Sequence, residues 1–128
     1  MRILTVMFGL FIGAIIVLAN TGVLGVYVDW LHAWPGSDKI AHFLLIGTLA
    51  ALVNLAGGGR RSRVCGWTVP TGSLWVMVVV ALEEASQAWI PARSCSLTDL
   101  AADLAGIVVL GGLGQWLARR AVPVRDVG

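Results

Sequence analysis

The side chains most able to do chemistry in this sequence lie near the ends of three apolar stretches and in the turn that joins two of them. They are Asp38, His42, Glu84, Gln87, Arg93, Asp99 and Asp103. Carboxylates and imidazole exchange protons, accept hydrogen bonds and bind divalent cations, whereas the planar guanidinium of arginine suits a carboxylate or a phosphate. We therefore predict a ligand-binding site made of these seven residues, and we assign no metal, cofactor or catalytic residue to it.

Charge is scarce in this chain, which makes its position informative. There are nine Lys and Arg and seven Asp and Glu among 128 residues. An ionisable group at the centre of a membrane helix costs about 2.5–3.5 kcal/mol on insertion scales, so such groups are seldom kept without a partner or a function. Asp38 and His42 are four residues apart, as are Asp99 and Asp103, so each pair shares one face of a helix. The spacing predicts one polar cluster shared by three helices.

Four apolar runs must position this cluster. They cover residues 3–20, 38–55, 69–90 and 97–117. Hydrophobic residues make up 58% of the chain and its mean hydropathy is +0.86, and each run is close to the roughly 20 helical residues that cross a bilayer. The first run is longer than the apolar region of a typical signal peptide, so we interpret it as an uncleaved helix. We predict a single all-α domain over residues 1–128, an integral membrane four-helix bundle.

The basic residues predict the orientation of the bundle. Seven of the nine lie before the first run, between the second and third, or after the fourth. Loops rich in Lys and Arg stay in the cytoplasm, so both termini are expected to be cytoplasmic and the polar cluster to face outward. The arginine excess favours contact with anionic lipid headgroups over nucleic acid.

The connections carry further predictions. Tyr27, Trp30 and Trp34 predict a short helix on the outer membrane surface between the first two runs. Residues 57–63, GGGRRSR, predict a flexible basic turn. Cys65 and Cys95 fall on opposite sides of the membrane, which excludes a disulfide between them.

Local signals predict where helices begin and pack. Ser37 is expected to cap the second run, and Ser96 with Asp99 is expected to form a capping box that starts the fourth. Small residues on the second and fourth runs predict close contact between these helices. They are Gly47, Ala50, Ala51, Gly106, Gly111, Gly112 and Gly114.

The motifs resemble those of the VanZ-like family of small bacterial membrane proteins, some of which are linked to resistance to glycopeptide antibiotics such as teicoplanin. The resemblance rests on Asp38-Lys39-x-x-His42-Phe43, on Glu84-x-x-Gln87 followed by Pro91-x-Arg93, and on Asp99 with Asp103-x-x-Gly106. Two positions depart from the family pattern, because Ala92 replaces a usual glycine and Asp103 an asparagine found in many members. The resemblance implies a multi-pass protein of the bacterial inner membrane that acts at the cell envelope.

Four functions fit these observations. The first is recognition of an envelope ligand, namely a peptidoglycan precursor, a lipid headgroup or a lipoglycopeptide. The second is an enzyme on a lipid-linked substrate, with Glu84 or His42 as acid or base, although no activated nucleophile is apparent. The third is a proton-coupled efflux carrier, disfavoured because the inner half of the runs shows almost no polar residue. The fourth is a structural subunit whose cluster only joins helices.

Overall fold

The computed structural model describes residues 1–23, 29, 33–91 and 96–121. Most of this part of the chain is helical. The helices are α1 (Arg2–Asn20), α3 (Ser37–Ala56), α4 (Thr71–Ser86), α5 (Leu97–Gly106) and α6 (Gly112–Ala121). The 3-10 turn η1 (Gln87–Trp89) extends α4, and the π-helical turn η2 (Ile107–Gly111) joins α5 to α6. Strands β1 (Arg61–Val64) and β2 (Trp67–Pro70) form an antiparallel hairpin.

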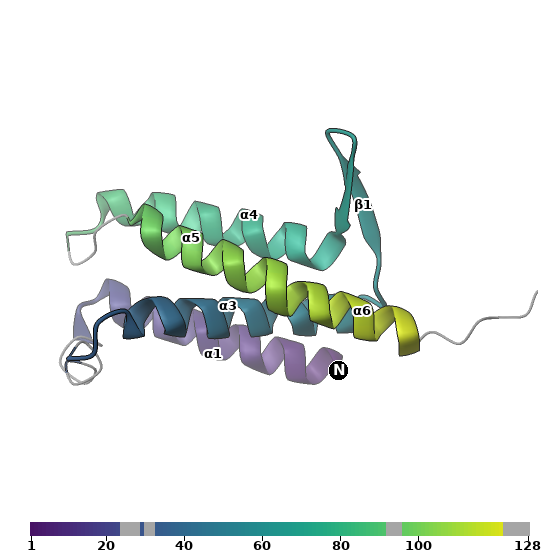
Figure 1. Cartoon of the computed structure of the whole chain (residues 1–128). Helices are drawn as coiled ribbons and strands as arrows, with labels where there is room; N and C mark the ends of the chain where they lie inside the picture. Colours follow the sequence, from purple (N-terminus) through teal and green to yellow (C-terminus); the bar gives the residue numbers. More distant parts are fainter. Residues whose placement is uncertain (24–28, 30–32, 92–95, 122–128) are drawn as a thin grey trace, which may run out of the picture.

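Helix α3 lies at the centre and contacts α1, α4 and the long helix formed by α5, η2 and α6 (Figure 1). The buried apolar core forms between these helices, around Ile12, Ile46, Ala50, Val80 and Ile107. The N-terminus, the hairpin and the end of α6 lie at one end of the bundle, which we call the arginine end (Figure 1). The start of α3, the end of α4 and the start of α5 lie at the other, which we call the polar end.

Within the described residues, three helical segments are long and apolar enough to cross a membrane. They are Arg2–Asn20, Ser37–Ala56 and Leu97–Ala121. Many large apolar side chains point away from the protein, including Ile3 at 78% exposure and Leu10 at 70%. Soluble proteins rarely expose large continuous apolar surfaces, so this surface suits contact with lipid.

The connection between α3 and α4 differs from the prediction. The prediction of a flexible turn over residues 57–63 is wrong for residues 61–63, because residues 61–70 form the β-hairpin, whereas residues 57–59 do form a turn. Cys65 and Gly66 have φ of 49° and 83°, as a two-residue hairpin turn with the right twist requires. Helix α4 consequently begins at Thr71, two residues later than predicted, and has 16 residues. It is not among the three segments above, so a fourth membrane span stays a prediction.

The predicted contact between small residues is present in the structure. A Cβ added to Gly47 would lie 2.7 Å from the Gly106 carbonyl oxygen, and one added to Gly114 would lie 2.5 Å from the Ala51 Cα. The backbones of α3 and the long helix therefore meet with almost no side chain between them. Gly112 is the exception in this set, because a Cβ there would meet nothing within 4 Å.

A buried amide network holds α3, α4 and η2 together at the arginine half of the bundle. Asn54 Nδ2 donates to Ser73 Oγ (2.8 Å) and to the Gly111 carbonyl (2.9 Å), and Asn54 Oδ1 accepts from the Ser73 backbone N–H (3.0 Å). Gln115 Nε2 donates to the Gly59 carbonyl at 2.7 Å. The expectation that this half is nearly without polar residues is therefore wrong: Asn54, Ser73 and Gln115 are all buried here.

Some predictions concern residues that the structure does not describe. The expected surface helix lies mainly there, since Tyr27, Trp30 and His32 are not described, whereas Trp34 is exposed. Cys65 is a free, exposed thiol at the tip of the hairpin, and Cys95 lies outside the described residues.

Candidate functional site

The polar end brings together side chains from α3 and α5. Helix α3 begins at Ser37 with Gly36 as its N-cap (φ 78°), so the prediction of Ser37 as the cap is wrong by one residue. Asp38 lies in the first turn of this helix, where its carboxylate interacts favourably with the positive end of the helix dipole. Asp38 and His42 therefore lie in the first two turns of α3.

Five ionisable side chains form a continuous chain of contacts between the two helices. Lys39 Nζ lies 3.3 Å from both Asp38 Oδ2 and Asp99 Oδ1. His42 Nδ1 lies 3.0 Å from Asp103 Oδ1, while its Nε2 lies 3.8 Å from Asp99 Oδ2. The first His42 distance is a hydrogen bond and the second is an ion-pair distance only. Asp99 therefore connects the lysine to the histidine.

The chain of contacts runs inward from the protein surface. Side-chain exposure is 44% for Lys39 and 42% for Asp38, falls to 27% for His42 and 18% for Asp99, and reaches 4% for Asp103. A buried carboxylate without a partner is strongly unfavourable, so the His42 hydrogen bond is what makes the position of Asp103 tolerable. The arrangement thus offers hydrogen-bonding groups at the surface, connected through progressively more buried side chains to the carboxylate of Asp103.

Glu84 has a different role from the one predicted. Its Oε1 accepts a short hydrogen bond of 2.5 Å from the backbone N–H of Ser96, the N-cap of α5. Ser96 Oγ in turn accepts from the Asp99 N–H at 3.3 Å. The predicted capping box is therefore half correct: Ser96 caps the helix, but Glu84 of α4 takes the bond that the Asp99 side chain was expected to make. This leaves the Asp99 carboxylate available for Lys39 and His42.

Gln87 is also satisfied within its own segment. It is 1% exposed, and its Nε2 lies 2.8 Å from both carboxylate oxygens of Glu83. Glu84 and Gln87 thus support the polar end from α4, through bonds to Ser96 and Glu83. Among the described residues, no hydrogen bond joins them to the Asp99–His42–Asp103 chain.

The sequence-based site is therefore recovered in parts. The structure joins Asp38, His42, Asp99 and Asp103, and it adds Lys39, which the seven-residue prediction leaves out although it directly follows Asp38 in the sequence. Arg93 lies outside the described residues, so its role as an anion clamp stays a prediction. Among the described residues, no group of three His, Cys, Asp or Glu side chains has the geometry of a metal site.

Two cavities open at the arginine end. One, of about 320 Å³, is lined by residues of β1 and α6, and the other, of about 170 Å³, lies between the end of α3 and the start of α4. The single outward pocket around the polar cluster thus stays a prediction.

The chain was compared with family models, with curated protein sequences and with solved structures, and none of the three comparisons returned a match.

Proposed function

We propose that this protein is a VanZ-like, multi-pass protein of the bacterial inner membrane, with both termini in the cytoplasm and a polar end that recognises a ligand of the cell envelope. The observation that carries the proposal is the chain of contacts from Lys39 through Asp99 and His42 to Asp103. It lies at the ends of two helical segments that are long and apolar enough to cross a membrane. Charged groups in that position are costly and are typically functional.

The charge of the cluster favours one kind of ligand group. Its described part contains the carboxylates of Asp38, Asp99 and Asp103 against Lys39 and His42, with Glu83 and Glu84 nearby on α4. Carboxylates only accept hydrogen bonds when ionised, so the cluster suits amino and hydroxyl groups. Lipoglycopeptides and peptidoglycan precursors both present such groups together with a lipid chain that can enter the bilayer.

The binding proposal is tested with teicoplanin and the purified full chain in detergent micelles. Asp99→Asn removes the charge that joins Lys39 to His42 and keeps the shape of the side chain, so we expect at least a tenfold weaker Kd, since a hydrogen bond to a charged group contributes about 1.5–3 kcal/mol. Isothermal titration calorimetry measures the difference.

The matched control is Asp29→Asn, which removes an exposed carboxylate that lies outside the cluster in sequence and makes no ion pair with it among the described residues. Its Kd is expected to stay within about twofold of the unaltered protein, as for surface changes away from a site. Equal affinity of all three proteins for teicoplanin, or loss in both variants alike, would contradict the proposal.

The orientation is tested with the native cysteines, since the chain has two. In a Cys95→Ser background, the exposed thiol of Cys65 at the tip of the hairpin is expected to be protected from a membrane-impermeant maleimide added to intact cells. A Thr98→Cys reporter in a cysteine-free background is expected to react, because Thr98 is exposed at the polar end. Opening the cells should make Cys65 reactive. The reverse pattern in intact cells would overturn the orientation.

One geometric feature supports a second candidate, a membrane enzyme that uses His42 as an acid or base. His42 Nε2 lies 3.8 Å from the nearest oxygen of Asp99, beyond hydrogen-bonding distance, while its Nδ1 is held by Asp103 at 3.0 Å. A carboxylate that orients one ring nitrogen leaves the other able to exchange a proton with a substrate. Turnover of a lipid-linked substrate that is lost in His42→Gln would favour this candidate.

A further inference from the structure

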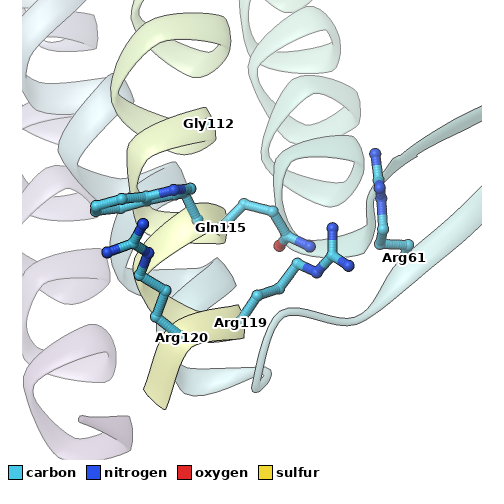
Figure 2. Close-up of a pocket in the computed structure, with 6 residues that line it drawn as sticks. Arg61, Gly112, Gln115, Arg119 and Arg120 are labelled. Carbon is cyan, nitrogen blue, oxygen red and sulfur yellow. The ribbon is translucent and has the colours of Figure 1, made fainter. Parts of the chain in front are cut away.

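The cavity at the arginine end has the composition of an anion site. Its lining residues are Arg61, Gly112, Gln115, Trp116, Arg119 and Arg120. Its volume of about 320 Å³ is at the lower end of the range for small-molecule pockets, about 300–1,000 Å³. Figure 2 shows the Arg119 guanidinium of α6 lying between the Gln115 amide and Arg61 of the hairpin in this view. Two separate elements thus bring guanidinium groups to one opening.

The positive charge at this opening has no internal counterion in the part of the chain that is described. None of its three arginines takes part in an ion pair there. Arg61 Nη2 makes a 3.3 Å contact with the Thr68 carbonyl, and Arg120 stacks 4.0 Å above the Trp116 ring. The described acids belong to the polar end or to the connection between α1 and α3. The opening therefore attracts anions.

Gln115 gives independent evidence that this cavity lacks a hydrogen-bond donor for one of its acceptors. Its residue is 6% exposed, and its Nε2 is fixed by the bond to the Gly59 carbonyl, yet its Oε1 is buried without a hydrogen-bond partner among the described residues. An unsatisfied buried acceptor costs about 1–3 kcal/mol, and it calls for a donor. A ligand with an anionic phosphate and a neighbouring hydroxyl would satisfy the arginines and Gln115 together.

We propose that this cavity binds the headgroup of an anionic phospholipid that carries a hydroxyl, of which phosphatidylglycerol is the simplest example. The guanidinium groups of Arg61 and Arg119 hold the phosphodiester, and Gln115 Oε1 accepts a hydrogen bond from the headgroup hydroxyl. Trp116 and Arg120 lie beside the opening at α6, in the last turns of a helix long enough to span a membrane, where an aromatic residue marks the level of the headgroups. The site shares no residue with the polar end.

The test is native mass spectrometry of the purified full chain titrated with phosphatidylglycerol. Arg61→Gln/Arg119→Gln is expected to weaken lipid binding about a hundredfold, at about tenfold for each charge-assisted contact. The matched control, Arg60→Gln/Arg63→Gln, removes two charges from the same connection without touching this cavity, and is expected to weaken binding less than threefold. Equal losses in both double variants would show a diffuse charge effect and overturn the site.

Two further arms test the cavity and the hydroxyl. Gly112→Leu fills the opening at a position where an added Cβ meets nothing within 4 Å, so it is expected to abolish tight binding without changing any charge, and retained binding would overturn the cavity as the site. Phosphatidylmethanol, an anionic diester without a hydroxyl, is expected to bind the unaltered protein several-fold more weakly than phosphatidylglycerol does. The Gln115→Leu variant is expected to bind both lipids with equal affinity. Equal affinity of the unaltered protein for both lipids would contradict the role of Gln115.

A soluble competitor distinguishes the source of the phosphate. Glycerophosphoglycerol, the headgroup without its acyl chains, is expected not to displace the lipid even in large molar excess, because the chains supply most of the apolar contact with the bundle. Displacement at low concentration would identify a free phosphodiester as the ligand and overturn the lipid assignment.

Discussion

Gly106→Ala is expected to lower the free energy of unfolding by about 3 kcal/mol, the upper part of the range for overpacked interiors. An added Cβ would overlap the Phe43 carbonyl oxygen, which is backbone of α3 and cannot turn aside. Relieving the overlap requires α3 and α5 to separate next to His42 and Asp103. Thermal unfolding in detergent, followed by circular dichroism, measures the change.

Gly112→Ala is the matched control for this substitution. It makes the same chemical change in the same long helix, but at a position where an added Cβ meets nothing within 4 Å. Alanine is favoured over glycine in a helix by about 1 kcal/mol, so this variant is expected to be as stable as the unaltered protein or slightly more stable. Equal destabilisation by both substitutions would show that the close contact between α3 and α5 is not what holds the bundle together.

His42→Ala is expected to destabilise the protein by about 3–5 kcal/mol, the cost of leaving one member of a buried pair alone. The Asp103 residue as a whole is 3% exposed, and its carboxylate is hydrogen-bonded to His42 Nδ1. Asp103→Asn is expected to be mild, because the amide oxygen can still accept a hydrogen bond from the imidazole. Chemical unfolding in mixed micelles gives the free energies.

A double-mutant cycle separates the pair from its surroundings. His42→Ala/Asp103→Ala removes both partners, so the double variant is expected to be more stable than the sum of the two alanine variants predicts, with a coupling of about 1–3 kcal/mol. Additive effects would mean that the 3.0 Å contact contributes nothing to stability. That result would leave the proposal of ligand binding by Asp99 standing, because the calorimetric test measures it separately.

The sequence predicted the elements better than the contacts between them. Residues 3–20 and 38–55 were expected as helices; α1 begins one residue earlier than expected, and α3 is longer by one residue at each end. The length of an apolar run is a local property, so it could be taken directly from the sequence. The hairpin was missed because four-residue strands are too short for a clear alternation, and a Cys-Gly turn is less distinctive than Asn-Gly.

The contacts of the site were predicted correctly where they follow from helical spacing. They were missed where the hydrogen-bond partner comes from another segment of the chain. Asp99 and Asp103 share a face by their spacing, and both contact His42 in the structure. No local pattern could show that Glu84, twelve residues earlier, would bind the Ser96 N–H in place of Asp99. Asn54 was likewise overlooked, because a single amide in an apolar run gives no sign of whether it will find Ser73 and Gly111.

At the π-helical turn Ile107–Gly111, the last helix can change its length by one residue without rotating the faces on either side of the turn. In a regular α-helix, inserting or deleting one residue rotates everything that follows by about 100°. A π-turn absorbs one residue, so the faces before and after it keep their alignment; here Asp103 and Gly106 on one side and Gly114 on the other all face α3. Deleting the exposed Val108 would convert this turn into an ordinary α-helical one with both faces still directed at α3, whereas the same deletion within α5 or α6 would turn the helix away from its partner. The long helix thus tolerates a change of length at one turn, and a sequence comparison between homologous chains should allow a single-residue gap there.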